Sequence, residues 1–249
     1  MLGREPMNPR AGQFGLAREA SQWTRWTEAP PRARRILRAT YRGWEPRAYG
    51  RLGSRQWRAP LPGTRIIVKD PFALLSVAAV VEATGAVPVV VYRRPEAVLA
   101  SYRRMGWRAD VAEFMALGAT IPAGSSDDDV AAMAAFWTFG YETVLDDLDR
   151  AVPGAVVVSH EELTRGGASA QRVLLDAIGL DRAPVPDPPD TDGGNRSEVR
   201  QDRLHNLERS PEEVMSGWQE RITEPEGRML AGATDETLAR LATRRLLLG

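Results

Sequence analysis

The sequence contains no cysteine. This absence excludes disulfide bonds, thiolate metal sites and cysteine nucleophiles. Histidine is almost as scarce, because His160 and His205 are the only two. His160 lacks the second histidine that a zinc-binding helix needs, so we expect a structural role for it. We therefore expect a protein that works without a metal.

The sequence also lacks an excess of one charge and any long hydrophobic run. The 33 basic and 33 acidic residues give a formal net charge of zero, which argues against a nucleic-acid or anionic-membrane binder. No apolar stretch has the length of a membrane span or the layout of a signal peptide. The hydrophobic content of 43% and charged content of 27% are ordinary for a soluble globular protein. We expect a cytoplasmic location.

Lysine occurs once, as Lys69, among the 33 lysines and arginines. An arginine side chain is a planar fork that always carries its charge, whereas lysine is a compact ammonium that can lose a proton. Lys69 therefore either occurs by chance in an arginine-rich composition or has a role at a reacting site.

Strands and helices alternate through the middle of the sequence. Three short apolar runs predict buried strands, Arg65–Lys69, Val87–Tyr92 and Ala155–Ser159. A helical pattern follows each of them, over Phe72–Thr84, over Pro95–Met105 and, after a Gly-Gly turn, over 168–180. This alternation predicts an α/β fold with a parallel sheet flanked by helices, in which ligands bind beyond the carboxyl ends of the strands.

The rest of the chain is predicted to be mostly helical or irregular. The longest helix is expected over Asp128–Arg150, capped by Ser125 and Ser126. The proline-rich run 183–195 indicates a connection or lid. We expect one domain over residues 1–249, with a helical and irregular region (1–62), an α/β core (63–182) and a C-terminal lid. The helices of that last part (183–249) are predicted at Ser197–Leu207, Pro211–Glu220 and Thr234–Leu247.

Several familiar binding motifs are missing or weak. The only lysine follows a valine, so a GxxxxGK phosphate-binding loop is excluded, and no GxGxxG occurs. The acidic runs Asp127–Asp129 and Asp146–Asp149 have the composition of a cation site, but we interpret them as helix caps and solvated faces. Between Arg32 and Arg58, nine arginines and one acid alternate with tyrosine and tryptophan. This surface either holds an anionic or sugar ligand or is a solvated helix face.

The stretch VVVYRRPEAVLAS is the most informative one. A predicted strand ends at Arg93, Pro95 occupies the first helical position, and Ser101 follows in the early turns. This arrangement places a guanidinium and a hydroxyl near a helix N-terminus, whose N–H groups and dipole favour an anion. The alternative is a strand-to-helix turn with surface arginines.

The spacing R-x-P-x-x-x-x-x-S formed by Arg93, Pro95 and Ser101 resembles the 3′-phosphate-binding segment of sulfotransferases that use phosphoadenosine phosphosulfate (PAPS). Other segments match that family in order. They are GREPMNPRAGQF, which resembles the EP-x-N segment of a bacterial branch, RIIVKDPFALLSVAAVV (the KDP segment), RRPEAVLASYRRMGW, VVVSHEELTRGGASAQRVLLDAIGL and SGWQERITEPEGRML. The resemblance covers most of the chain and implies a P-loop-like sulfotransferase architecture.

One part of the family pattern is missing from the sequence. Such sulfotransferases normally begin with a strand and a P-R-S-G-T-T-like loop that cradles the 5′-phosphosulfate, whereas here Glu5 of the EP segment is already the fifth residue. We expect either that the chain starts inside the domain of its family or that the first strand and loop have been lost. The site for the sulfuryl donor is then incomplete.

The resemblance implies a mechanism and a set of site residues. An acceptor hydroxyl attacks the sulfur of PAPS in line, and adenosine 3′,5′-bisphosphate leaves. Glu5 would be the general base, Lys69 would stabilise charge on the departing oxygen, and Asp70 would orient Lys69 or act as an alternative base. Arg93 and Ser101 would hold the 3′-phosphate, and Arg200 would close over it. The acceptor would be a small molecule or a glycan.

Two other functions stay open. The first is a degenerate sulfotransferase-like domain that catalyses nothing and binds a nucleotide, an anionic glycan or a protein partner, which the missing loop favours. The second is an unrelated nucleotide-binding transferase or kinase, against which the absence of a Walker loop and a kinase signature argues.

Overall fold

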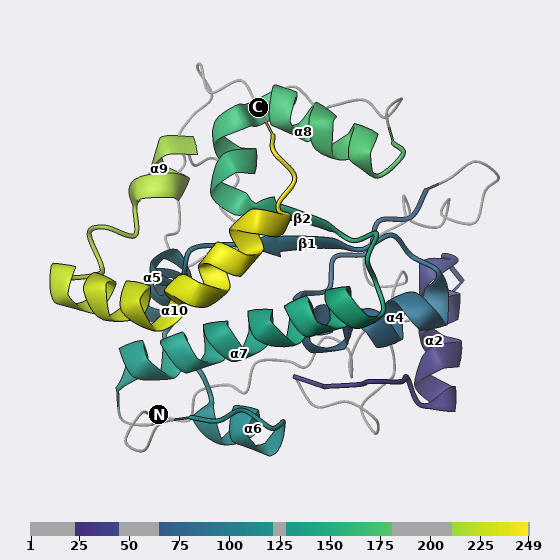
Figure 1. Cartoon of the computed structure of the whole chain (residues 1–249), viewed down its shortest axis with the longest axis horizontal. Coiled ribbons are helices and arrows are strands. Elements are labelled where there is room, and N and C mark those ends of the chain that lie inside the picture. The colour runs from purple at the N-terminus through teal and green to yellow at the C-terminus, as the bar shows by residue number, and fades with distance from the viewer. Residues whose placement is uncertain (1–22, 45–64, 122–127, 181–210, 249) are drawn as a thin grey trace, which may run out of the picture. The chain divides into compact units, whose positions relative to one another are not determined.

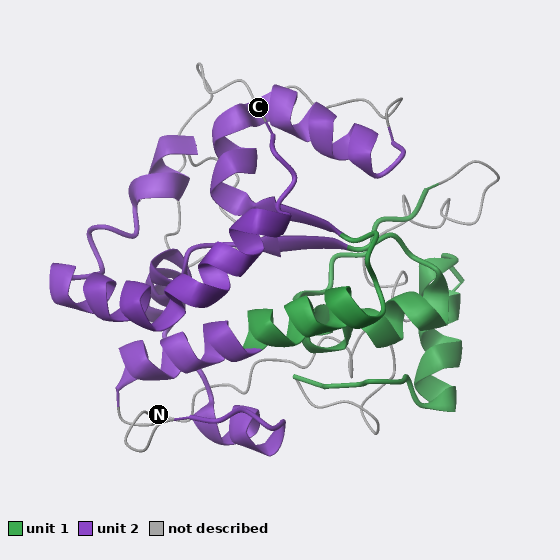
Figure 2. Ribbon diagram, viewed as in Figure 1, with its two compact units in different colours: residues 1–88, 140–155 green, residues 89–139, 156–249 purple. Residues whose placement is uncertain are grey.

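The computed structural model describes residues 23–44, 65–121, 128–180 and 211–248. Figure 1 shows the helices and strands, and Figure 2 shows the two compact units into which the chain divides. Unit 1 consists of residues 1–88 and 140–155, and unit 2 consists of residues 89–139 and 156–249. The described residues are mostly helical, with one small parallel sheet, so the fold is mixed α/β as expected. The prediction of one domain over the whole chain stays a prediction.

The sheet of unit 2 is formed by two valine-rich strands, β1 (Val89–Tyr92) and β2 (Val156–Ser159), which lie side by side (Figure 1). They pair in parallel, with Val90 opposite Val157 and Tyr92 opposite Ser159. The C-terminal segment covers the other edge of β2, because the N–H of Leu246 donates to the carbonyl of Val157 at 2.8 Å. Two of the three predicted strands are thus confirmed, and both end at the same edge of the sheet.

The prediction of a strand over Arg65–Lys69 is wrong. Residues 65–70 have no regular secondary structure, and Ile67 has 78% of its surface exposed. Exposed and half-buried residues alternate along this segment, as they do in extended chain with one face partly covered. The segment lacks a ladder of hydrogen bonds to a neighbouring strand, and its apolar composition cannot supply one.

The predicted helices of the described residues are present, but several differ from the prediction in their ends and lengths. Their bounds are α2 (Pro31–Tyr41), the 3-10 helix η2 (Pro71–Ser76), α4 (Val77–Thr84), α5 (Pro95–Met105), α6 (Val111–Ala116), α7 (Asp129–Arg150), α8 (His160–Ala177), α9 (Pro211–Ser216) and α10 (Glu224–Arg244). The helix predicted over Pro95–Met105 is confirmed with both ends, and that over Asp128–Arg150 begins one residue later. Ser125, Ser126 and the segments 183–195 and Ser197–Leu207 lie outside the described residues.

Capping side chains explain why two helices begin earlier than predicted. The hydroxyl of Ser159 accepts a hydrogen bond from the N–H of Glu162 at 3.3 Å, so α8 starts directly after β2, and the Gly-Gly pair forms a kink instead, with Gly167 at φ 53°. In α10, the carboxylate of Glu226 accepts from the N–H of Thr223 at 2.7 Å in a capping box. Helices α8 and α10 therefore both begin at capping residues that precede the apolar periodicity of the sequence.

Unit 1 is held mainly by the packing of α2 against α4. Both helices present alanine and aliphatic residues to a shared core, in which Ala33, Leu37 and Ala79 are fully or almost fully buried. Small side chains let the two helices approach closely, and Arg38 at the edge donates to the carbonyl of Ala83 at 2.7 Å. The acidic run at the end of α7 also contributes here, because a carboxylate oxygen of Asp147 accepts from the N–H of Ala78 at 3.2 Å.

In unit 2, α8 covers the sheet and the C-terminal segment completes its core. Val158 of β2, Ala170 of α8 and Leu248 are buried together. The start of α7 is capped by Asp128, whose carboxylate accepts from the N–H of Val130 at 2.9 Å. At Asp128 the acidic run therefore caps a helix, as interpreted from the sequence.

Candidate functional site

The junction between β1 and α5 is fixed by its backbone. The indole N–H of Trp137, which is buried, donates to the carbonyl of Arg93 at 2.8 Å. The N–H of Arg94 donates to Oε1 of Glu161 at 3.1 Å. Residues from α7 and α8 thus hold the turn after the strand, and Pro95 starts the helix with a suitable backbone angle. The backbone position from which the Arg93 side chain extends is therefore fixed.

The side chain of Arg93 reaches toward the C-terminal part of unit 2. Its Nη2 donates to the carbonyl of Val214 in α9 at 3.2 Å. His160 lies near it, and burial, followed by the positive charge of Arg93, lowers the pKa of His160 below its usual range, while Glu161 acts in the opposite direction. The environment around Arg93 thus disfavours a second positive charge on His160.

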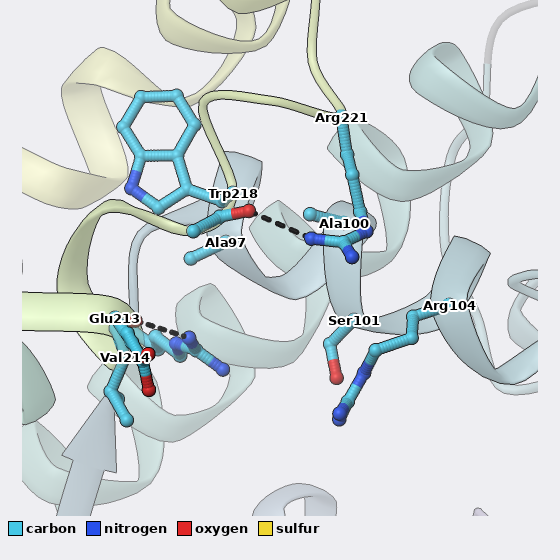
Figure 3. A pocket seen from close by; sticks show the side chains of 10 residues that line it. Ala97, Ala100, Ser101, Arg104, Glu213, Val214, Trp218 and Arg221 are labelled. Atoms are coloured by element: carbon cyan, nitrogen blue, oxygen red, sulfur yellow. Dashed lines mark hydrogen bonds between the residues drawn. The ribbon is translucent and has the colours of Figure 1, made fainter. Parts of the chain in front are cut away.

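A pocket opens beside Arg93, between α5 and the segment 213–221 (Figure 3). The empty space around it, including the part that belongs to open solvent, amounts to about 330 Å³. Its lining combines arginine side chains, one serine and small or apolar residues. The lining residues are Arg93, Ala97, Ala100, Ser101, Arg104, Glu213, Val214, Gly217, Trp218 and Arg221.

Helix α5 forms one wall of the pocket through a single face. Ala97, Ala100, Ser101 and Arg104 follow the spacing i, i+3, i+4 and i+7, which brings side chains to the same side of an α-helix. The two alanines are buried and leave room above the helix, whereas the serine and the arginine point toward the pocket (Figure 3). The wall is therefore apolar at its base and hydrogen-bonding at its surface.

The opposite wall is the short segment 213–221, which arginine side chains hold in place. The guanidinium of Arg94 lies over the ring of Trp218, 5.5 Å from its centre. Nη1 of Arg103 donates to the carbonyl of Arg221 at 3.0 Å, and Nη1 of Arg221 donates to the carbonyl of Gly217 at 2.9 Å. At Gly217 a Cβ atom would lie 2.6 Å from the carbonyl oxygen of Glu213, so this turn needs glycine.

Arg103 also joins three helices on its own side of α5. Its guanidinium forms ion pairs with Asp129 of α7 at 2.8 Å and with Glu226 of α10 at 2.7 Å. The hydrogen bond from Arg103, with help from the N–H of Thr223, lowers the pKa of Glu226 to about 2, and Arg103 lowers the pKa of Asp129 as well. Asp129, which belongs to the acidic run Asp127–Asp129, is therefore engaged in an ion pair with Arg103.

The structure brings together two of the six predicted site residues, Arg93 and Ser101, in one pocket. Lys69 and Asp70 belong to unit 1 and do not line it. Lys69 is exposed, and Asp70 is half-buried at the start of η2, where its carbonyl accepts from the N–H of Ala73 at 3.2 Å. The predicted residues Glu5 and Arg200, and the part of the arginine and aromatic surface from 45 to 58, lie outside the described residues.

Sequence reasoning missed Arg104, Glu213 and Arg221 as pocket residues. The helical spacing of Ala97, Ala100, Ser101 and Arg104 was visible in the sequence and would have found Arg104. Arg221 lies more than a hundred residues further along the chain, and no local pattern connects it with α5. Only the tertiary structure shows that the two segments face each other.

Comparisons with protein-family models, with curated proteins and with solved structures find no significant match. Within the part of the chain that the structure describes, no three acidic or histidine side chains gather as they would around a metal ion. None of the described helices has the length and apolar character that crossing a bilayer requires. Among the described residues, the pocket beside Arg93 is the feature from which a function can be argued.

Proposed function

We propose that this protein is a PAPS-dependent sulfotransferase, with the P-loop-like architecture of that family, that transfers a sulfuryl group to a hydroxyl of a small molecule or glycan. One observation carries the proposal. Arg93 and Ser101, the residues that the resemblance assigns to the 3′-phosphate, line the same pocket at the end of β1 and the start of α5.

The pocket suits the phosphate of the proposed ligand. A phosphate group offers only acceptor oxygens, and the pocket offers donors in the guanidinium of Arg93 and the hydroxyl of Ser101. Among the described residues no hydrogen bond engages the hydroxyl of Ser101. The parallel strands end at this edge of the sheet, where open α/β folds bind their ligands.

In the proposed reaction the oxygen of the acceptor hydroxyl bonds to sulfur while the bond from sulfur to the 5′-phosphate oxygen breaks. Glu5 takes the proton of the hydroxyl, and adenosine 3′,5′-bisphosphate leaves. Lys69 stabilises the negative charge that develops on the departing oxygen, and Asp70 orients Lys69. Arg93, Ser101 and Arg200 hold the 3′-phosphate and fix the nucleotide in the orientation that transfer requires.

The first prediction concerns Arg93. Calorimetric titration with adenosine 3′,5′-bisphosphate should show binding by the parent chain and at least about tenfold weaker binding by Arg93→Ala, because a charge-assisted hydrogen bond to the 3′-phosphate is lost. Arg165→Ala removes an exposed arginine of α8 outside the pocket and should bind like the parent.

Adenosine 5′-monophosphate, which lacks the 3′-phosphate, should bind weakly to the parent and equally weakly to Arg93→Ala. An affinity of Arg93→Ala for the bisphosphate equal to that of the parent would refute the 3′-phosphate site. A parent chain that does not bind the bisphosphate would overturn the proposed function as a whole.

The second candidate is a sulfotransferase-like domain that binds a nucleotide, an anionic glycan or a protein partner without catalysis. The same pocket supports it, because a cationic pocket with a serine hydroxyl can hold a phosphate without any group transfer. Incubation with sulfur-labelled PAPS and a panel of hydroxyl acceptors separates the two candidates. Label appearing in an acceptor supports transfer, and nucleotide binding without any transfer supports the second candidate.

A further inference from the structure

We propose that Arg104 and Arg221 form a second cationic side of the pocket, which makes it select a doubly charged phosphate monoester. The resemblance to sulfotransferases assigns no role to either residue. For the identity of the nucleotide the inference rests on the proposed function, whereas the preference for a phosphate monoester rests on the pocket alone.

Arg104 and Arg221 line the same pocket from its two opposite walls. Arg104 follows Ser101 by three residues on α5, which is about 4.5 Å along the helix axis and on the same face. Arg221 comes from the opposite wall, and its guanidinium points toward the side of α5 that carries Ser101 (Figure 3). The hydroxyl of Ser101 and the guanidinium of Arg104 extend in the same direction from α5, and Arg221 lines the same pocket from the other wall (Figure 3).

Arg221 is held in position from two directions. Its carbonyl accepts a hydrogen bond from Arg103 at 3.0 Å, and its Nη1 donates to the carbonyl of Gly217 at 2.9 Å. Arg103 is fixed in turn by Asp129 and Glu226. A guanidinium has five donors, so the bond to Gly217 leaves others for a ligand. A pre-positioned arginine loses less conformational freedom when an anion binds.

The charge of the lining favours a dianion. Three arginines and one glutamate are among the lining residues. A phosphate monoester carries a charge of about −1.5 to −2 near neutral pH, with a second pKa of about 6, whereas a diester carries about −1. A monoester is therefore attracted to the arginines of the lining more strongly than a diester is.

The second ionisation of the phosphate predicts binding that strengthens as pH rises. Other titratable groups near the pocket act in the opposite direction. His160 lies beside Arg93, and its protonation in acid would add positive charge and favour an anion. Binding that strengthens as pH rises therefore reports the second ionisation of the phosphate. The charged and titratable groups around the two walls are Arg93, Arg94, Glu96, Arg103, Arg104, Asp129, His160, Glu161, Glu213, Arg221 and Glu226.

Adenosine 3′-monophosphate is the suitable probe, because it carries only the phosphate that the pocket would hold. We expect the parent chain to bind it about tenfold more tightly at about pH 7.5 than at about pH 5, as the monoanion becomes a dianion. Arg221→Ala and Arg104→Ala should each bind it about tenfold more weakly at the higher pH and should lose most of the pH dependence. Arg221→Lys should be intermediate.

Matched controls separate the pocket from general effects. Arg165→Ala should keep both the affinity and the pH dependence of the parent, and circular dichroism should show that every variant is folded. His160→Gln should keep the rise of affinity with pH, since that rise comes from the ligand. A pH dependence that vanished in His160→Gln would assign it to the imidazole and overturn the inference.

The outcomes distinguish this inference from the proposed function. Parent-like binding by both Arg221→Ala and Arg104→Ala, together with loss of binding in Arg93→Ala, would overturn the inference and leave the proposed function intact. If the parent binds neither 3′-phosphorylated nucleotide, titration with inorganic phosphate decides. Phosphate binding that is lost in Arg221→Ala would support the cationic pocket without the nucleotide, and no phosphate binding would overturn both.

Discussion

Two apolar stretches of this chain look alike in sequence and differ in structure. Val89–Tyr92 forms β1, and Val90 within it has 5% of its surface exposed. Residues 65–70 form no regular structure, and Ile67 has 78% exposed. The difference lies in the neighbours, because β1 pairs residue by residue with β2 whereas residues 65–70 have no such ladder. Apolar composition allows a strand, but a paired neighbour makes one.

The largest effect is expected from a charge placed in each stretch. Val90→Asp should lower the free energy of unfolding by about 3 kcal/mol or more, because an unpaired carboxylate would be buried in β1. Ile67→Asp, as the matched control, should change it by less than about 0.5 kcal/mol, because that side chain already faces water. Urea unfolding followed by circular dichroism measures both. Equal costs would show that Ile67 is covered in solution and that the two stretches are alike.

The same comparison shows what could be predicted from the sequence. The strands Val89–Tyr92 and Val156–Ser159 and the helix Pro95–Met105 were predictable, because apolar runs, Pro95 and Gly106 are local signals. From these elements the common position of Arg93 and Ser101 follows, since both depend on one strand and the helix after it. This half of the pocket needed no knowledge of distant contacts.

The other half of the pocket was beyond prediction from the sequence. Arg221 and Glu213 come from a segment whose placement depends on contacts with Arg93, Arg94 and Arg103, more than a hundred residues earlier. Such long-range polar contacts leave no periodic pattern in the sequence. The start of α10 was missed for a related reason, because the capping box at Thr223 precedes the apolar residues by which a helix is recognised.

An intermediate effect is expected from the ion pairs that hold α5. Helix α4, which follows η2 in the chain, is held largely by buried alanine and valine, whereas Arg103 of α5 forms ion pairs with Asp129 and Glu226. The pKa of Glu226 is lowered from 4.5 to about 2, so its contribution to stability is fully present above pH 4.5 and is lost as pH falls toward 2.

Glu226→Gln should therefore lower the stability of the protein at neutral pH and flatten the dependence of stability on pH over that acid range. Thermal unfolding at a series of pH values measures the effect. Glu224→Gln is the control, because it removes an exposed ion pair with Arg228 on the same helix and should have little effect. An acid dependence that is the same in Glu226→Gln and in the parent would mean that Arg103 does not tie α10 to α5.

The smallest effect on stability, and the most informative one for chemistry, is expected at Lys69. This lysine is exposed in a segment without regular structure, so Lys69→Arg should change the free energy of unfolding by less than about 0.5 kcal/mol. Sulfuryl transfer from labelled PAPS should nevertheless fall by about tenfold or more, because a planar guanidinium cannot approach the departing oxygen as a compact ammonium does. The reciprocal change Arg65→Lys, in the same exposed segment, should leave both quantities unchanged. Parent-like transfer by Lys69→Arg would remove the chemical reason for the single lysine while leaving the phosphate pocket of unit 2 untouched, because that pocket contains neither residue.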